Sequence, residues 1–182
     1  MNAKETILLL KDNRLAREDI LNYFLVSPAK MAELVELSIN PNPYPIQEHA
    51  TWTLIHATAK RQSEFEKYQP RIIDHFLEIS PKNPFETGNQ TVLRNLCKVL
   101  TQLPLIDYRD GELLDQLIVH LKNEDNKVAL HAYSLLKINQ FVKKHPELKP
   151  EIAEIIQLKK EKLELEARRQ MFLDSQSAPK QP

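Results

Sequence analysis

A six-residue pattern of apolar and polar residues recurs along this chain with a period of about 41 residues. Residues 72–77 read Ile-Ile-Asp-His-Phe-Leu, and residues 113–118 read Leu-Leu-Asp-Gln-Leu-Ile. Looser copies begin at Met31 and Ile152. A fixed period near 40 is typical of helical solenoids, in which stacked helix pairs bury a face that no single pair can bury alone. The repeat therefore predicts an all-α superhelix with a surface suited to binding.

The glycine and proline content supports helices. The 182 residues include only two glycines, Gly88 and Gly111, against twelve prolines. A β-rich fold normally needs glycines at hairpins and bulges, and two distant glycines exclude a glycine-rich phosphate loop. The prolines lie between the apolar-periodic segments, where they start and stop helices.

Proline positions and apolar spacing divide the chain into helices. Ser27-Pro28 is typical of a helix start, with a capping serine and a proline in the first turn. The polar end, 174–182, is predicted to be a disordered tail after one domain over residues 1–173. The expected helices are 3–11, 15–26, 28–37, 46–62, 70–79, 88–102, 110–122, 125–144 and a long C-terminal helix over 147–173.

Two further echoes support the repeat. Residues 52–55 read Trp-Thr-Leu-Ile, and residues 133–136, two periods later, read Tyr-Ser-Leu-Leu. The loops 42–44 and 83–85 read Asn-Pro-Tyr and Asn-Pro-Phe, 41 residues apart. We predict that the aromatic residue of each loop fills the gap between stacked helix pairs.

With paired helices, a period near 40 and prolines at the boundaries, the chain resembles the HEAT and armadillo class of helical repeats over residues 28–158. HEAT repeats often carry an aspartate inside the second helix, which Asp74 and Asp115 match. The resemblance implies an α-α superhelix of three to four HEAT-like helix pairs.

Charge and cysteine content limit the functional classes. The chain has 25 basic and 25 acidic residues, and neither half is strongly charged. Nucleic-acid binding requires a concentrated basic surface, so composition gives that function no support. Cys97 is the only cysteine, and no apolar stretch approaches the roughly 18 residues of a membrane helix. The N-terminal apolar run is too short for a signal peptide. We therefore expect a cytoplasmic protein.

A polar stripe on the helix 46–62 is a candidate binding surface. It consists of His49, Thr53, His56 and Lys60. Seven residues of helix separate the two histidines by about 10.5 Å, too far for one metal ion. We therefore expect no metal site here. Because Cys97 lies in a leucine stripe, we expect it in the core rather than as a nucleophile, and the sole tryptophan, Trp52, is likewise expected in the core.

The leading functional hypothesis is a non-enzymatic module that binds another protein, without a cofactor, through a concave face lined by second helices. The residues expected to be exposed there include Arg71, Asp74, His75 and Asp115, followed by residues 151 and 154. An enzyme with a pocket between helices is a third reading that no motif supports.

A competing hypothesis is a HEAT-like protein that binds DNA or repairs alkylated DNA. It requires a basic concave surface on which eight cations converge: Arg14, Arg17, Lys60, Arg61, Lys67, Arg71, Lys143 and Lys144.

The C-terminal helix carries a heptad-like stripe. Leu158, Leu165 and Phe172 recur every seven residues. Such a stripe suits either docking on the chain's own solenoid or homodimerisation.

Overall fold

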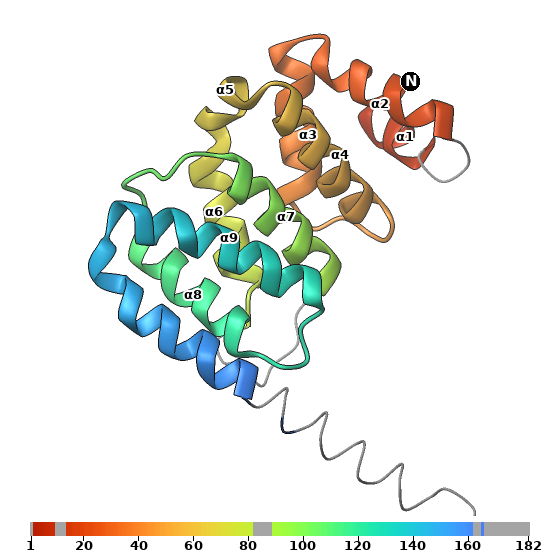
Figure 1. Cartoon of the computed structure of the whole chain (residues 1–182). Coiled ribbons are helices and arrows are strands. Elements are labelled where there is room, and N and C mark those ends of the chain that lie inside the picture. Colours follow the sequence, from red (N-terminus) through yellow and green to blue (C-terminus); the bar gives the residue numbers. More distant parts are fainter. Residues whose placement is uncertain (1, 10–13, 82–88, 162–164, 166–182) are drawn as a thin grey trace, which may run out of the picture. The chain divides into compact units, whose positions relative to one another are not determined.

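The computed structural model describes residues 2–9, 14–81, 89–161 and 165. Every regular element in these ranges is a helix, as the repeat predicts (Figure 1). The chain falls into two compact units, 1–140 and 141–182, so the prediction of one domain over 1–173 stays a prediction. The helices of the first unit are α1 (Ala3–Leu8), α2 (Arg14–Leu25), α3 (Pro28–Ile39), α4 (Ile46–Lys60), α5 (Gln62–Phe65), α6 (Gln69–Ile79), α7 (Gln90–Gln102), α8 (Asp110–Lys122) and the greater part of α9 (Val128–Lys144).

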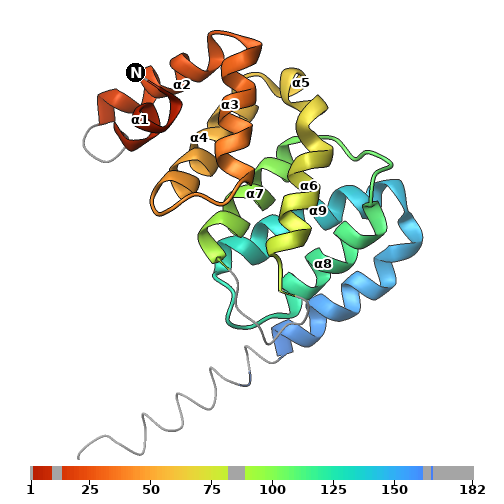
Figure 2. The ribbon, with the colours of Figure 1, turned by 180° about the vertical axis from the view of Figure 1, so that it is seen from behind.

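In the first unit the helices form two layers. The second helices of successive pairs, α3, α6 and α8, contact one another in order, and Figure 2 shows them as a continuous row. The first helices α4 and α7 pack against each other behind that row, and α9 follows α7. The first helices α4 and α7 also pack on second helices, α4 on α3 and α7 on α6. This is the all-α solenoid arrangement that the sequence predicts.

Capping residues set the helix starts. Ser27 Oγ accepts a hydrogen bond from Lys30 N at 3.3 Å, with Pro28 in the first turn, as predicted. Asn89 Oδ1 accepts from Val92 N at 3.2 Å and starts α7 in the same way. Local side chains thus define the boundaries that the prolines indicate.

The 41-residue period corresponds to two columns of buried side chains that run through the second helices. Val35, Phe76 and Leu117 are all fully buried. The column one turn earlier, formed by Met31, Ile72 and Leu113, is no more than 2% exposed at any member. These apolar members of the repeated pattern therefore form part of the core between the layers. They also place α3 in register as the second helix of the first pair.

The predicted role of the loop aromatics is wrong at Tyr44, whose side chain is 78% exposed. The loop closes through Asn42 instead. Its Nδ2 donates to the carbonyls of Leu37 at 3.3 Å and of Asn40 at 3.0 Å. With the backbone held in this way, the tyrosine ring does not need to pack. Phe85 lies outside the described residues.

The second unit begins at residue 141 and includes a 3-10 turn, Pro146–Leu148, followed by helix over 149–161. Phe141 and Ile152 are buried, whereas Leu158 and Leu165 are more than half exposed. The remainder of the predicted helix 147–173, with Phe172, and the tail 174–182 lie outside the described residues, apart from residue 165.

Candidate functional site

An ion pair joins α3 to α6 at the surface of the second helices. The Arg71 guanidinium donates to both carboxylate oxygens of Glu36, with Nη2 3.0 Å from Oε2. The arginine lowers the pKa of Glu36, and the carboxylate raises the pKa of Arg71. Arg71 is exposed, as predicted, but its charged end is bound to the neighbouring repeat.

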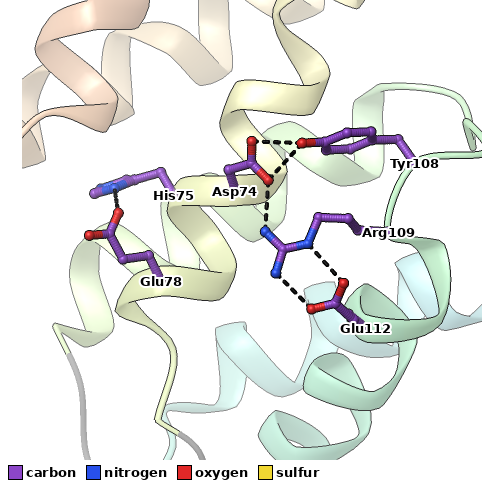
Figure 3. Close-up of polar contacts among 6 residues, drawn as sticks. All are labelled: Asp74, His75, Glu78, Tyr108, Arg109 and Glu112. Carbon is purple, nitrogen blue, oxygen red and sulfur yellow. Dashed lines mark hydrogen bonds and ion pairs between the residues drawn. The ribbon is translucent and has the colours of Figure 1, made fainter.

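A larger polar cluster joins α6 to α8 (Figure 3). Tyr108 Oη donates to the two Asp74 oxygens at 3.0 and 2.8 Å, and Arg109 Nη1 donates to Oδ1 at 2.8 Å. The remaining Arg109 nitrogens donate to Glu112 at 2.9 and 2.6 Å. The Asp74 carboxylate thus accepts hydrogen bonds from two donors at the start of the next second helix, Tyr108 and Arg109, which gives it a structural role between repeats.

Arg109 also has an uncommon backbone conformation. Its φ of 47° lies in the left-handed region, which a non-glycine residue adopts at a cost in free energy. The two carboxylates that bind its guanidinium, Asp74 and Glu112, hold the residue in place at the start of α8.

The ion pairs that connect successive second helices, which we call joints, share a spacing that sequence reasoning missed. Glu36 and Arg71 are 35 residues apart, and so are Asp74 and Arg109. An acid on one second helix therefore pairs with an arginine at or near the start of the next. This repeated separation is visible in the sequence and identifies Arg109, which the search for a 41-residue period does not.

His75 was predicted to be exposed, but it is buried, with only 6% of its surface accessible. Its Nε2 lies 3.0 Å from Gln47 Nε2 on α4, and its Nδ1 lies 3.6 Å from Glu78 Oε2 (Figure 3). Burial lowers the pKa of His75, against an opposing effect of Glu78. The neutral imidazole therefore packs between the layers, where it contacts α4.

Asp115, the repeat counterpart of Asp74, has a different environment. It is exposed and forms no hydrogen bond or ion pair within the described part of the chain. Glu78, one turn after Asp74, has a carboxylate side chain that is 79% exposed. Together with Arg71, these two acids are exposed on α6 and α8.

The predicted polar stripe on α4 reaches the surface only at its C-terminal end. Thr53 is buried and donates to the carbonyl of His49 at 2.8 Å, so it is not a surface residue as expected. His49 is half-buried. His56 and Lys60 are exposed. A threonine inside a helix readily satisfies its hydroxyl in this way, which explains its burial in the layer.

His56 and Lys60 border a depression between α2 and α4 of about 190 Å³. Trp52 forms its wall, half-buried rather than in the core as expected. The Arg17 guanidinium lies over the indole, 5.1 Å from the ring centroid, and the His56 ring is 4.2 Å away on the same helix. The lining residues are Arg17, Glu18, Leu21, Trp52, Thr53, His56 and Lys60.

A family model described as a HEAT repeat domain matches residues 9–170 of the chain. The chain belongs to the HEAT repeat family. The comparisons with curated proteins and with solved structures gave no match. The buried columns and the 35-residue joints are therefore properties of a HEAT repeat domain that covers most of the sequence.

Cys97 of this HEAT repeat protein is in the core, as predicted. Its side chain is fully buried, with Sγ 3.9 Å from Ser134 Oγ on α9. Burial raises the pKa of the thiol to about 12, which leaves it protonated at neutral pH. Among the described residues no group of histidine, cysteine and carboxylate side chains is arranged to hold a metal ion, and no helix is suited to cross a membrane.

Five of the eight cations of the DNA-binding hypothesis have described side chains in the first unit, and these five make separate local contacts. Arg71 pairs with Glu36 on the second helices, and Arg61 pairs with Glu64 on α5. Lys67 lies over Tyr68, with Nζ 5.0 Å from the ring centroid. Arg17 and Lys60 do meet, at the α2–α4 depression. Lys143 and Lys144 belong to the second unit, and the side chain of Arg14 is not described.

Proposed function

We propose that this HEAT repeat protein is a non-enzymatic interaction module that binds another protein through its second-helix face. By second-helix face we mean the solvent-facing side of α3, α6 and α8. HEAT repeats stack second helices into a continuous surface, and such surfaces are suited to protein ligands. The membership of the family supports this general role.

The observation that carries the proposal is an excess of negative charge on this face, in a chain whose net charge is zero. The three second helices together carry seven acidic and three basic residues. The acidic residues are Glu33, Glu36, Asp74, Glu78, Asp110, Glu112 and Asp115, and the basic ones are Lys30, Arg71 and Lys122.

The joints between repeats use part of this charge and leave the rest accessible. Glu36 pairs with Arg71, and Asp74 and Glu112 share Arg109. Glu78 and Asp115 remain exposed. A protein partner with a basic segment therefore complements this face, because charge complementarity favours encounter and correct orientation.

A catalytic role has less support, because the groups suited to catalysis are engaged in packing. The thiol of Cys97 is buried and protonated. His120 is fully buried, with Nε2 3.0 Å from Ser80 Oγ, and burial lowers its pKa to about 4. Nucleic-acid binding through this face is also disfavoured, since an acidic surface repels phosphates.

The test is capture of a partner by the full chain with a photo-crosslinking residue at Lys122, an exposed position on α8 two turns after Asp115. A double charge reversal, Glu78→Lys with Asp115→Lys, is expected to reduce capture of the same protein by at least about tenfold, a loss of ~1.4 kcal/mol. Asp19→Lys, at an exposed acid of α2, is the matched control and should leave capture unchanged. Recovery of no protein above background at several salt concentrations, or equal capture by the charge-reversed chain, would contradict the proposal.

A further inference from the structure

The depression between α2 and α4 lies in the first-helix layer, away from the second-helix face. Its floor is formed by Leu21 and Thr53, which are 7% and 1% exposed. Two cations and an indole border it, with Arg17 over Trp52 and Lys60 two turns along α4. A cation above an aromatic ring is a favourable pairing that keeps the guanidinium in a fixed position.

The same arrangement occurs two repeats later, which provides an internal comparison. Lys98 lies over Tyr133, with Nζ 5.0 Å from the ring centroid, and these residues follow Arg17 and Trp52 by 81 positions. The counterpart of His56 there is Lys137, which is fully buried. Its ammonium donates to the carbonyls of Leu103 and Pro104 and to Gln140 Oε1.

At the α2–α4 site the corresponding groups are not used in this way. His56 is exposed, contacts Trp52 and forms no hydrogen bond in the described part of the chain. Lys60 has a single long contact, 3.7 Å from Glu18, and both side chains of that pair are about half or more exposed. Exposed ion pairs of this kind contribute little to stability. The polar groups of the depression are therefore available to a ligand.

The charges around the depression favour an anion. Burial first, and then Arg17 and Lys60, lower the pKa of His56, so the histidine is neutral at pH 7 and adds no positive charge to the site. Glu18 partly offsets them. A single carboxylate between Arg17 and Lys60 balances the remaining positive charge.

The size of the depression indicates what carries that carboxylate. A volume of 190 Å³ is below the roughly 300–1,000 Å³ of small-molecule and cofactor sites. It corresponds to about six waters at ~30 Å³ each, which is the scale of one side chain. Glu18 borders the site, and its carboxylate repels a nucleic-acid backbone that carries a charge about every 1.7 Å. One side chain of a protein segment fits better.

We propose that the α2–α4 depression binds an acidic side chain of a protein segment, with its carboxylate between Arg17 and Lys60 and its stem against Trp52. This gives the protein a second recognition surface, of opposite charge preference to the second-helix face. Glu18 releases Lys60 when the incoming carboxylate takes its place.

The test uses the fluorescence of Trp52, which is the only tryptophan of the chain and lies in the site. The full chain is titrated with a capped hexaglutamate peptide, with capped hexaglutamine, and with a six-nucleotide oligothymidine. We expect a saturable change in emission with hexaglutamate and none with hexaglutamine. Arg17→Ala combined with Lys60→Ala should weaken hexaglutamate binding by at least about tenfold.

Two controls make the outcome specific. Lys122→Ala, at an exposed lysine of α8, should bind hexaglutamate as the wild type does. Arg17→Lys, which retains the charge, should recover part of the lost affinity. Circular dichroism confirms that each variant is folded, which is expected because both substituted cations are exposed.

Several results would overturn the proposal. They are the absence of a saturable change with hexaglutamate, equal affinity of the double variant, and tighter binding of the oligonucleotide. A change of emission with protein concentration alone would instead identify a second copy as the occupant. Because the depression and the second-helix face lie on different helices, the double variant should still capture the second-helix partner, and each proposal can fail without the other.

Discussion

The two helix layers of the first unit use polar side chains in different ways. The second helices are joined at the surface by ion pairs, Glu36 with Arg71 and Asp74 with Arg109. The first helices are joined by buried contacts that carry no net charge, such as Asn95 Nδ2 donating to Thr51 Oγ1 at 3.0 Å. Exposed charged side chains therefore help to hold the second helices together, whereas the stacking of the first helices does not depend on exposed charges.

Lys137 is the exception in the first-helix layer, because its contact with a neighbouring first helix involves a charged side chain. It is a fully buried lysine, and burial lowers its pKa to about 8. Its ammonium donates to the carbonyl of Leu103 at 3.0 Å and to Gln140 Oε1 at 2.9 Å. The lysine thereby satisfies the Leu103 carbonyl just after the end of α7 through a buried hydrogen bond.

The largest effect is expected from breaking this buried contact. Lys137→Ala leaves the Leu103 carbonyl without its donor and opens a cavity, and should lower the free energy of unfolding by about 3 kcal/mol. Lys127→Ala, at an exposed lysine, should change it by no more than ~0.5 kcal/mol. Urea unfolding followed by circular dichroism measures both. Equal losses in the two variants would show that Lys137 is not a structural residue.

The next effect concerns pH and the buried His120. Burial and then His131 lower its pKa to about 4, from 6.5 in the unfolded chain. Between these values the unfolded state binds more protons, so stability is fully present above pH 6.5 and is lost as pH falls towards 4. The loss should be on the order of 3 kcal/mol, at ~1.36 kcal/mol per pKa unit.

His120→Gln tests this assignment, because glutamine can still bond to Ser80 but does not titrate in this range. The decrease in the urea midpoint between pH 7 and pH 4.5 should be smaller in this variant than in the wild type. His145→Gln, in the second unit, is the control. A pH dependence that is the same in wild type and His120→Gln would mean that His120 already ionises when folded.

A smaller effect separates Asp74 from its repeat counterpart Asp115. Asp74→Ala removes the acceptor of Tyr108 and Arg109 and should lower the melting temperature measurably. Asp115→Ala should leave it unchanged, because Asp115 is exposed and makes no contact of this kind in the described structure. Differential scanning fluorimetry compares the two. If the two variants have the same melting temperature, the joint between α6 and α8 does not depend on Asp74.

The sequence was sufficient to predict most of the helices, although not α5, and the repeat that underlies the buried columns. Apolar spacing is a local property, and its repetition every 41 residues directly gives Val35, Phe76 and Leu117 as one column. The predicted helix starts were also confirmed where a capping serine precedes a proline, as at Ser27. Features that depend on local sequence patterns are therefore predictable from the sequence.

The sites were less predictable because they depend on how the helices stack. Arg109 meets Asp74 only through the offset of neighbouring second helices. His75 is buried because Gln47 on another helix faces it. Trp52 was expected in the core, but α2 covers it only in part, through Arg17, and leaves a depression. The sequence of one helix alone does not predict these contacts. The 35-residue spacing between acid and arginine would, however, have indicated the pair of Asp74 and Arg109.

The smallest effect on folding is expected in the second unit. Leu158 and Leu165 are exposed, so replacing both with Asp should not lower the free energy of unfolding. If the C-terminal helix mediates homodimerisation, as the heptad spacing predicts, the same double variant should lower the sedimentation coefficient at high concentration. An unchanged sedimentation coefficient would remove the C-terminal helix as a dimer contact.

A double-mutant cycle between Asp74 and Arg109 tests most directly the claim that second-helix charges join the repeats. The four proteins are the wild type, Asp74→Ala, Arg109→Ala and the combination, and the free energy of unfolding is measured for each in urea. Because the two side chains form one ion pair, we predict that the double variant loses less stability than the sum of the two single losses. Strictly additive losses would contradict the account, since Asp74 would then be an accessible surface residue like Asp115.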